Sequence, residues 1–191
     1  MKRDRVLKIF RNIPEIKTER LLLRRFSVSD HNDMYEYASN DEVTRYLLWE
    51  PHENVRYTIR YIKYVIAKYR TGEFYDWAIT LRESGKMIGT CGFTSFDFSN
   101  KSGEVGYVIN PAYRGRGIAP EALRAVIRFG FEVLGLERIE AKYMVGNESS
   151  RRVMEKCGMS FEGIKRSGVF SKGMMRDIGV CAVLYGDLYE S

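Results

Sequence analysis

The sequence predicts a mixed α+β fold in which helices cover both faces of a central, mainly antiparallel sheet. Three observations support this fold class. Helical patterns dominate the first third of the 191-residue chain, two strand-like runs joined by a hairpin signal follow, and strands alternate with helices to the end. At this length one domain with a full hydrophobic core is expected, over residues 1–191 with 1–17 as an N-terminal extension. Residues 1–11 are expected to add only a mildly basic segment.

The first half of the chain carries one strand and several helical signals. Ser29 or Asp30 is a good N-cap for a helix. From residue 52 to 69 apolar side chains recur every three or four positions, which indicates an amphipathic helix half buried in the core. The tyrosines of this segment fit that helix better than a surface for stacking nucleic-acid bases. The expected elements are a strand over 20–26 and helices over 30–39, 41–46 and 52–69.

The second half carries most of the sheet. Two strand-like runs joined by Arg82-Glu83-Ser84-Gly85 predict a hairpin. Pro120 suits the first turn of a helix, where a backbone N–H is not needed, and Gly135 ends that helix. The expected strands are 74–81, 86–93, 103–109, 138–145, 161–166 and 176–185, and the expected helices are 120–134 and 149–156.

Composition excludes several classes of protein. The net charge of +6 includes no block of five like charges, so a nucleic-acid-binding tail is not indicated. Neither a secretory signal segment nor an apolar run of about 18 residues, the length that spans a bilayer, is present. The three widely spaced cysteines suit a reducing compartment such as the cytoplasm, and the two histidines form no metal-ligand spacing with them. We therefore expect a cytoplasmic protein without a metal site.

The segment Tyr113–Glu121 is the most informative part of the chain. It connects an apolar strand to a strongly periodic helix through a turn with two glycines and two arginines. A helix N-terminus has unpaired N–H groups and the positive end of the helix dipole, and glycine lets a phosphate approach them. The Rossmann and Walker phosphate-binding patterns are both absent. The pattern present is Arg114-x-x-Gly117-x-Ala119.

This pattern resembles R/Q-x-x-G-x-G/A, the pyrophosphate-binding signature of the GNAT superfamily of acetyl-CoA-dependent N-acetyltransferases. The preceding Gly103–Ile109 and the later Asn147-Glu148-Ser149-Ser150 with Glu155-Lys156-Cys157-Gly158-Met159 resemble other parts of the same site. The order and spacing most resemble the branch that contains ribosomal-protein alanine and serine N-terminal acetyltransferases. The resemblance implies a central sheet splayed at its middle, with a bulge in the strand 103–109 that lets pantetheine enter.

The resemblance also implies the site residues. Acetyl-CoA would bind through the backbone of Val108 and Ile109, through the pyrophosphate turn, and through Asn147. Glu104 would be the general base and Ser150 the general acid near the sulfur, with Tyr107 and Tyr143 as alternative hydroxyls. The pyrophosphate turn consists of Arg114, Gly115, Arg116, Gly117, Ile118 and Ala119.

Each of these residues also has a purely structural interpretation. Glu104 could be an exposed carboxylate at a strand end, Asn147 a helix N-cap, and Ser150 a serine bonded to its own helix. The two arginines of the turn could simply be solvated. The sequence leaves these alternatives open.

The implied activity is direct transfer of an acetyl group from acetyl-CoA to a primary amine. The acceptor favoured by the branch is a protein N-terminal α-amine, for example that of a ribosomal protein. A small-molecule amine such as an amino acid, polyamine or antibiotic is the alternative, and a non-catalytic acyl-CoA-binding regulator is a third possibility. Neither membrane nor direct nucleic-acid binding is expected, and the protein could be a monomer or a homodimer.

Overall fold

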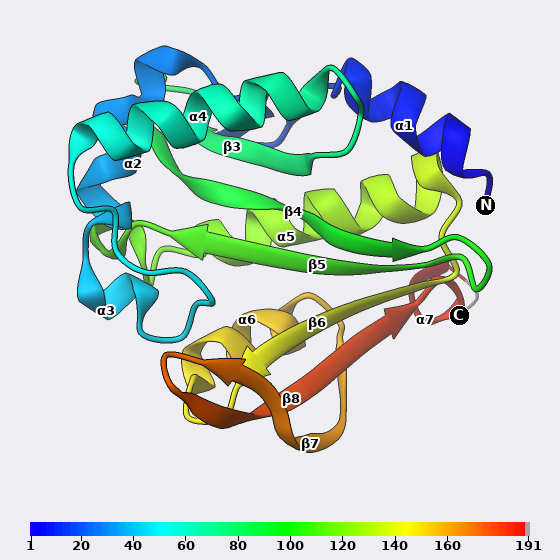
Figure 1. Cartoon of the computed structure of the whole chain (residues 1–191). Helices are drawn as coiled ribbons and strands as arrows, with labels where there is room; N and C mark the ends of the chain where they lie inside the picture. The colour runs from blue at the N-terminus through cyan, green and yellow to red at the C-terminus, as the bar shows by residue number, and fades with distance from the viewer. Residues whose placement is uncertain (190–191) are drawn as a thin grey trace.

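The computed structural model describes residues 1–189 and shows an eight-stranded sheet with helices on both faces (Figure 1). The strand order is β1-β2-β3-β4-β5-β6-β8-β7, and every neighbouring pair is antiparallel except β5 and β6. The strands are β1 Ile16–Lys17, β2 Leu21–Arg24, β3 Tyr75–Leu81, β4 Met87–Asp97, β5 Ser102–Ile109, β6 Arg138–Met144, β7 Ser160–Ser171 and β8 Met174–Leu184. The predicted mixed fold class is confirmed.

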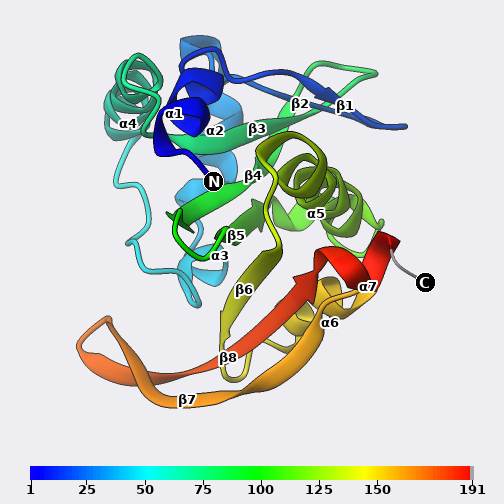
Figure 2. The ribbon, with the colours of Figure 1, turned by 90° about the vertical axis from the view of Figure 1, so that its right-hand side faces the viewer.

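The helices form a layer on each side of the sheet (Figure 2). One layer holds α2 and α4, and the other holds α5 and α6. The α-helices are α1 Arg3–Arg11, α2 His31–Ala38, α3 Asp41–Thr44, α4 Val55–Tyr69, α5 Ile118–Phe129, α6 Glu148–Lys156 and α7 Tyr185–Tyr189. Short 3₁₀ turns cover Val28–Asp30 and Pro111–Tyr113, and α5 ends in a π-helical turn over Gly130–Leu134.

The sheet opens at its middle, between β5 and β6. These parallel strands pair only from Ser102 opposite Arg138 to Val105 opposite Ala141. Beyond that point residues 106–109 remain paired with β4, and residues 142–144 remain paired with β8, but not with each other. The two strands therefore diverge toward the C-terminal end of β5 and leave one backbone edge of residues 106–109 without a neighbouring strand.

A bulge accompanies this opening, but it lies in β4 and not in the strand 103–109, where the family resemblance implied it. Phe93 pairs with Val105 and Ser95 pairs with Glu104, so Thr94 is the extra residue. The Thr94 hydroxyl donates a hydrogen bond to the Glu104 carbonyl oxygen at 3.3 Å. This contact with the opposite strand stabilises the inserted residue in β4, while β5 keeps a regular register against it.

The N-terminal segment is also more structured than expected. Residues 3–11 form α1, and its Val6 and Phe10 are completely buried in the hydrophobic core. The Phe10 ring meets the Trp77 ring edge-on at 5.4 Å between centroids. The Trp77 indole N–H donates to the Pro14 carbonyl oxygen at 2.7 Å. The expected extension therefore supplies part of the core.

Candidate active site

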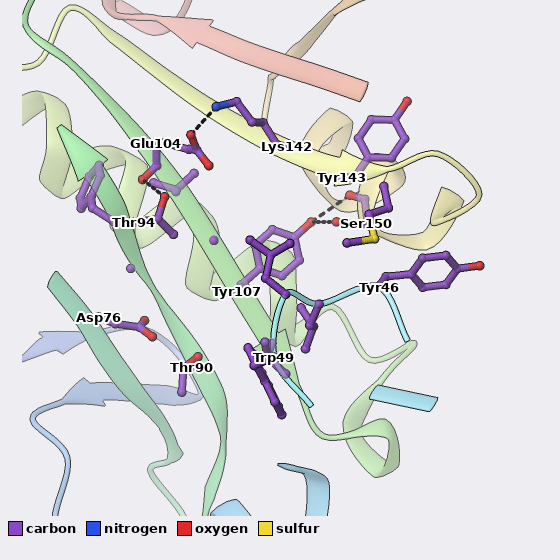
Figure 3. Close-up of a pocket in the computed structure, with 18 of the residues that line it drawn as sticks. Tyr46, Trp49, Asp76, Thr90, Thr94, Glu104, Tyr107, Lys142, Tyr143 and Ser150 are labelled. Atoms are coloured by element: carbon purple, nitrogen blue, oxygen red, sulfur yellow. Dashed lines mark hydrogen bonds and ion pairs between the residues drawn. The ribbon is translucent and has the colours of Figure 1, made fainter. Parts of the chain in front are cut away.

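A cavity of about 720 Å³ lies where β5 and β6 diverge. Its walls come from both sides of the opening, and the loop between α3 and α4 borders it (Figure 3). Trp49 of that loop and Tyr61 of α4 give it an aromatic wall. Its volume is within the range of small-molecule sites, which are mostly apolar with a few oriented polar groups.

The glycine-rich turn lies where β5 leads into α5. Gly115 and Gly117 both adopt φ of +74°, a left-handed conformation that favours glycine, and α5 begins at Ile118. Within residues 1–189 the amides of Gly115, Arg116 and Gly117 donate no hydrogen bond to the protein. These amides and the first turn of α5 form a cluster of free donors that fits an anion such as a pyrophosphate.

The two arginines of the turn are exposed and have protein partners. Arg114 forms an ion pair with Glu42 at 2.9 Å, and the Arg116 guanidinium lies 5.5 Å from the centre of the Tyr113 ring. Exposed arginines of this kind add little binding energy on their own. The backbone amides are therefore the main anion-binding groups that the turn offers.

Arg20 fixes the turn from outside, a role that the sequence analysis did not identify. Its guanidinium donates to the Arg116 carbonyl oxygen at 2.8 Å and to Glu121 of α5 at 2.7 Å. Thr18 also donates to Glu121, at 2.6 Å. Burial raises the pKa of Glu121, but the hydrogen bonds from Thr18 and Arg20 outweigh it and leave that pKa below its usual value. These contacts hold the turn and the start of α5 in one arrangement.

The Ser150 and Tyr107 hydroxyls meet at the opening, 2.8 Å apart. Tyr107 comes from β5 and Ser150 from the first turn of α6, and the Tyr107 hydroxyl also lies 2.9 Å from the Ser150 carbonyl oxygen. Burial raises the pKa of Tyr107 well above its usual value, and the Ser150 hydroxyl offsets part of that rise. The pair therefore presents neutral, hydrogen-bonded hydroxyls to the cavity (Figure 3).

Asn147 is the N-cap of α6. Its side-chain oxygen accepts hydrogen bonds from the Ser150 amide at 3.3 Å and from the Ser149 hydroxyl at 2.8 Å. It also lines the cavity. The capping interpretation is thus observed, and the side-chain NH₂ group stays available to a ligand.

Glu104 lines the cavity and forms an ion pair with Lys142 of β6 (Figure 3). The two residues face each other just where the strands begin to diverge. The carboxylate that the sequence analysis expected to accept a proton is therefore already bonded to a cation. Val108 lines the cavity and Ile109 is buried, and their backbone lies on the edge of β5 that faces the opening.

Asp76 of β3 also lines the cavity and was not identified from the sequence. Nothing in Tyr75-Asp76-Trp77 marks it, because a single aspartate in a strand is usually a solvated residue. The neighbouring Trp77 lies in the core. Within residues 1–189 no group of three or more His, Cys, Asp or Glu side chains is placed to hold a metal ion.

Comparisons with known proteins identify the kind of site. Residues 20–160 match the family described as the acetyltransferase (GNAT) domain. YoaA of Bacillus subtilis, an uncharacterized N-acetyltransferase, is 34% identical over 171 residues, which cover 90% of this chain and 97% of YoaA. No helix within residues 1–189 has the length and apolar character needed to cross a membrane.

Solved structures share the fold. A GNAT-family acetyltransferase from Bacillus anthracis superposes with a TM-score of 0.80 at 29% identity, covering 90% of this chain and 98% of that one. RimL, the ribosomal L7/L12 α-N-protein acetyltransferase determined with coenzyme A, superposes with a TM-score of 0.76 at 20% identity, covering 90% and 98%. At that identity the RimL likeness concerns the fold alone.

Proposed function

This chain belongs to the GNAT acetyltransferase family, and from that premise we propose that it transfers acetyl groups from acetyl-CoA to the α-amine of a protein N-terminus. The observation that carries the proposal is the opening between β5 and β6, which has an anion-binding turn at one end and the Tyr107–Ser150 hydroxyl pair beside it. The order and spacing of the sequence motifs, which most resemble the ribosomal-protein branch, support the choice of a protein N-terminus as acceptor.

The chain's groups match the parts of acetyl-CoA. The amides of residues 115–119 would bind the pyrophosphate, and the unpaired edge of residues 106–109 would bond the pantetheine amides as a missing strand would. The Asn147 side chain faces the same cavity and would donate to pantetheine. These groups would place the thioester near Gly106, beside Tyr107 and Ser150.

The reaction needs an uncharged amine and a proton for the departing thiolate. The Tyr107–Ser150 pair is the proton donor we propose for the sulfur, because its hydroxyls are half-buried, neutral and hydrogen-bonded to each other. A carboxylate on the acceptor side would take a proton from the incoming ammonium group. Glu104 is one such carboxylate, and Asp76 is another.

A small-molecule amine is the second candidate acceptor. The observation that favours it is the aromatic wall that the α3–α4 loop and α4 give to the cavity. This wall consists of Trp49, His52, Tyr57 and Tyr61. Such a wall suits a compact ligand, whereas a peptide also needs an open groove. An assay of acetyl transfer to peptides and to small amines distinguishes the two acceptors.

The test is release of CoA thiol from acetyl-CoA in the presence of N-terminal peptides and small amines. Turnover on peptides beginning with Ala or Ser supports the N-terminal acceptor. Turnover on small amines alone overturns that acceptor and keeps the acetyltransferase assignment. Tight acetyl-CoA binding without any turnover contradicts an acetyltransferase function for the panel and favours a regulator.

Cofactor binding has its own test in Gly117→Val. The side chain would fill the approach to the amides and strain a residue with φ of +74°, so acetyl-CoA affinity should fall at least about tenfold, measured by calorimetry. Gly85→Val is the matched control, because Gly85 has φ of +73° in the β3–β4 hairpin with no atom within 4 Å of an added Cβ. Equal affinity in a folded Gly117→Val protein would contradict the phosphate-binding role.

A further inference from the structure

The Asp76 carboxylate projects over a part of the sheet that has no side chains. Asp76 lies opposite Gly92 of β4, and Gly92 lies opposite Gly106 of β5. A Cβ atom at Gly92 would come within 2.8 Å of Asp76 Oδ1. The carboxylate therefore leans over Gly92 toward β5. Asp76 and the two glycines all line the cavity in which we position the thioester.

One oxygen of the carboxylate lacks a protein partner. Its Oδ1 atom is buried and has no hydrogen bond, and Asp76 forms no salt bridge within residues 1–189. A buried carboxylate oxygen without a partner is costly to a fold. Such a group is typical of a site that receives a ligand.

Burial raises the pKa of four titratable neighbours that sense the Asp76 charge, so these side chains are neutral at physiological pH. They come from α2, α4 and β4, and the Tyr37 hydroxyl on α2 is itself buried without a partner. The Tyr69 hydroxyl donates to the Asp76 carbonyl oxygen at 2.8 Å, not to the carboxylate. These neighbours are Tyr37, Tyr61, Tyr69 and Cys91.

Burial raises the pKa of Asp76 to about 7, although the Thr90 side chain and the Trp77 amide lower it in part. A proton acceptor works best when its pKa lies near the working pH, and a free α-amine has a pKa of about 7.7–8.0. Proton transfer from such an amine to this carboxylate is thus close to balanced. Glu104 differs, since Lys142 already occupies its carboxylate.

We propose that Asp76, rather than Glu104, binds the ammonium form of the acceptor and takes its proton. This inference rests on the proposed acetyl transfer. One N–H proton passes from the ammonium group to Asp76. The freed nitrogen lone pair then forms the C–N bond to the acetyl carbon, and the C–S bond breaks with its electron pair on sulfur. The nitrogen then loses its second proton to the Tyr107–Ser150 pair, which replaces the proton that these hydroxyls give to the thiolate, and Asp76 returns its own proton to water.

The kinetic test compares Asp76→Asn, Glu104→Gln and Asp4→Asn across pH with the best amine of the panel. Asp4 is an exposed residue of α1 and controls for the Asp-to-Asn change itself. We expect Asp76→Asn to lower kcat/KM by about 100-fold or more, which is the usual contribution of a general base to the rate. The affinity for acetyl-CoA should stay unchanged. In the wild type and in Glu104→Gln, kcat/KM should fall as pH drops below about 7, because Asp76 becomes protonated.

A wild-type rate in folded Asp76→Asn would overturn the inference. The inference would also be overturned if the fall of kcat/KM at low pH disappeared in Glu104→Gln and persisted in Asp76→Asn. That result would make Glu104 the base. Both variants would still transfer acetyl groups at some rate, so neither outcome touches the proposed function itself.

A second test needs no turnover. Carbon-13 NMR can follow the titration of the Asp76 carboxyl carbon, assigned by its loss in Asp76→Asn. Alaninamide and n-butylamine serve as probes with a primary ammonium group, and N-acetylalaninamide is the matched control without one. With CoA present, an ammonium probe should lower the pKa of Asp76, because it stabilises the carboxylate, while N-acetylalaninamide should not. No shift with either amine overturns the inference even if the enzyme assay finds no acceptor.

Discussion

At the scale of single residues, Asp76 should make the stability of the fold depend on pH. Its pKa is about 7 in the folded protein and 3.8 as the ordinary value, so the folded state holds its proton more tightly than the unfolded state does. Stability is therefore full below the unfolded pKa and is lost as pH rises through the folded pKa. The difference between these two pKa values corresponds to at most about 4 kcal/mol of folding free energy.

Asp76→Asn should consequently raise the free energy of unfolding near neutral pH by about 1–4 kcal/mol and leave it nearly unchanged at about pH 4. Urea unfolding of the wild type, Asp76→Asn and Asp4→Asn at both pH values measures this. A gain in stability of Asp76→Asn together with a loss of turnover is the pattern of a residue kept for function. Equal stability of all three proteins near pH 8 would show that Asp76 is not strained by burial.

Tyr107 and Ser150 should act as one unit. Because their hydroxyls are hydrogen-bonded to each other, we expect Tyr107→Phe and Ser150→Ala each to lower kcat by about 10- to 100-fold, and the double variant to lose little more. Thiol-release assays at saturating acetyl-CoA measure the effect. Strictly multiplicative losses in the double variant would indicate two independent roles.

These residues also show what a sequence can and cannot predict about a site. Ser150 could be proposed because a motif of adjacent residues carries it. The Tyr107–Ser150 contact spans 43 positions, so it exists only once α6 is placed against β5. Asp76 becomes notable only through what is missing around it, namely a partner for Oδ1 and side chains on Gly92 and Gly106. The spacing of residues along the chain therefore could not predict these surroundings.

At the scale of elements, α1 is the clearest addition to the predicted fold. Phe10 is completely buried among the rings of Tyr75, Trp77, Phe96 and Phe129. Phe10→Ala should therefore destabilise the protein by about 3–5 kcal/mol, as large-to-small core substitutions do. Lys8→Ala, on the exposed face of the same helix, should change stability by less than about 0.5 kcal/mol. Urea unfolding of both variants tests this, and equal small effects would mean that α1 packs only loosely.

Helix α1 was not predicted because it has only two core positions, one helical turn apart, and most of its other residues are charged. The longer helices were predictable, since α4 and α5 repeat their apolar residues at helical spacing over several turns. The position of the bulge was not predictable in the same way. A register shift is a property of two strands together, and either β4 or β5 could have carried the extra residue.

At the scale of the whole molecule, the sheet has two parts that share few backbone hydrogen bonds. Strands β1 to β5 form one part and β6 to β8 the other, joined by four residue pairs at the start of β5 and β6 (Figure 1). Near the opposite end of the opening, Lys172 at the β7–β8 turn donates to the Thr44 carbonyl oxygen at 2.9 Å. A ligand lying along the opening would contact both parts and add a link between them.

Acetyl-CoA should therefore stabilise the molecule as a whole and not only the turn that binds its phosphates. At 100 times its dissociation constant it should raise the free energy of unfolding by about 2.7 kcal/mol. For a chain of this length that is a rise in Tm of roughly 5–10 °C. Hydrogen exchange should slow in β5 and in β6 alike, because the ligand occupies the edge between them. Gly117→Val should lose most of the rise at the same ligand concentration, whereas Gly85→Val should retain it. Slower hydrogen exchange confined to residues 114–121 would contradict binding along the opening, because pantetheine would then lie outside it. The proposed pantetheine contacts of residues 106–109 and Asn147 would then be wrong as well.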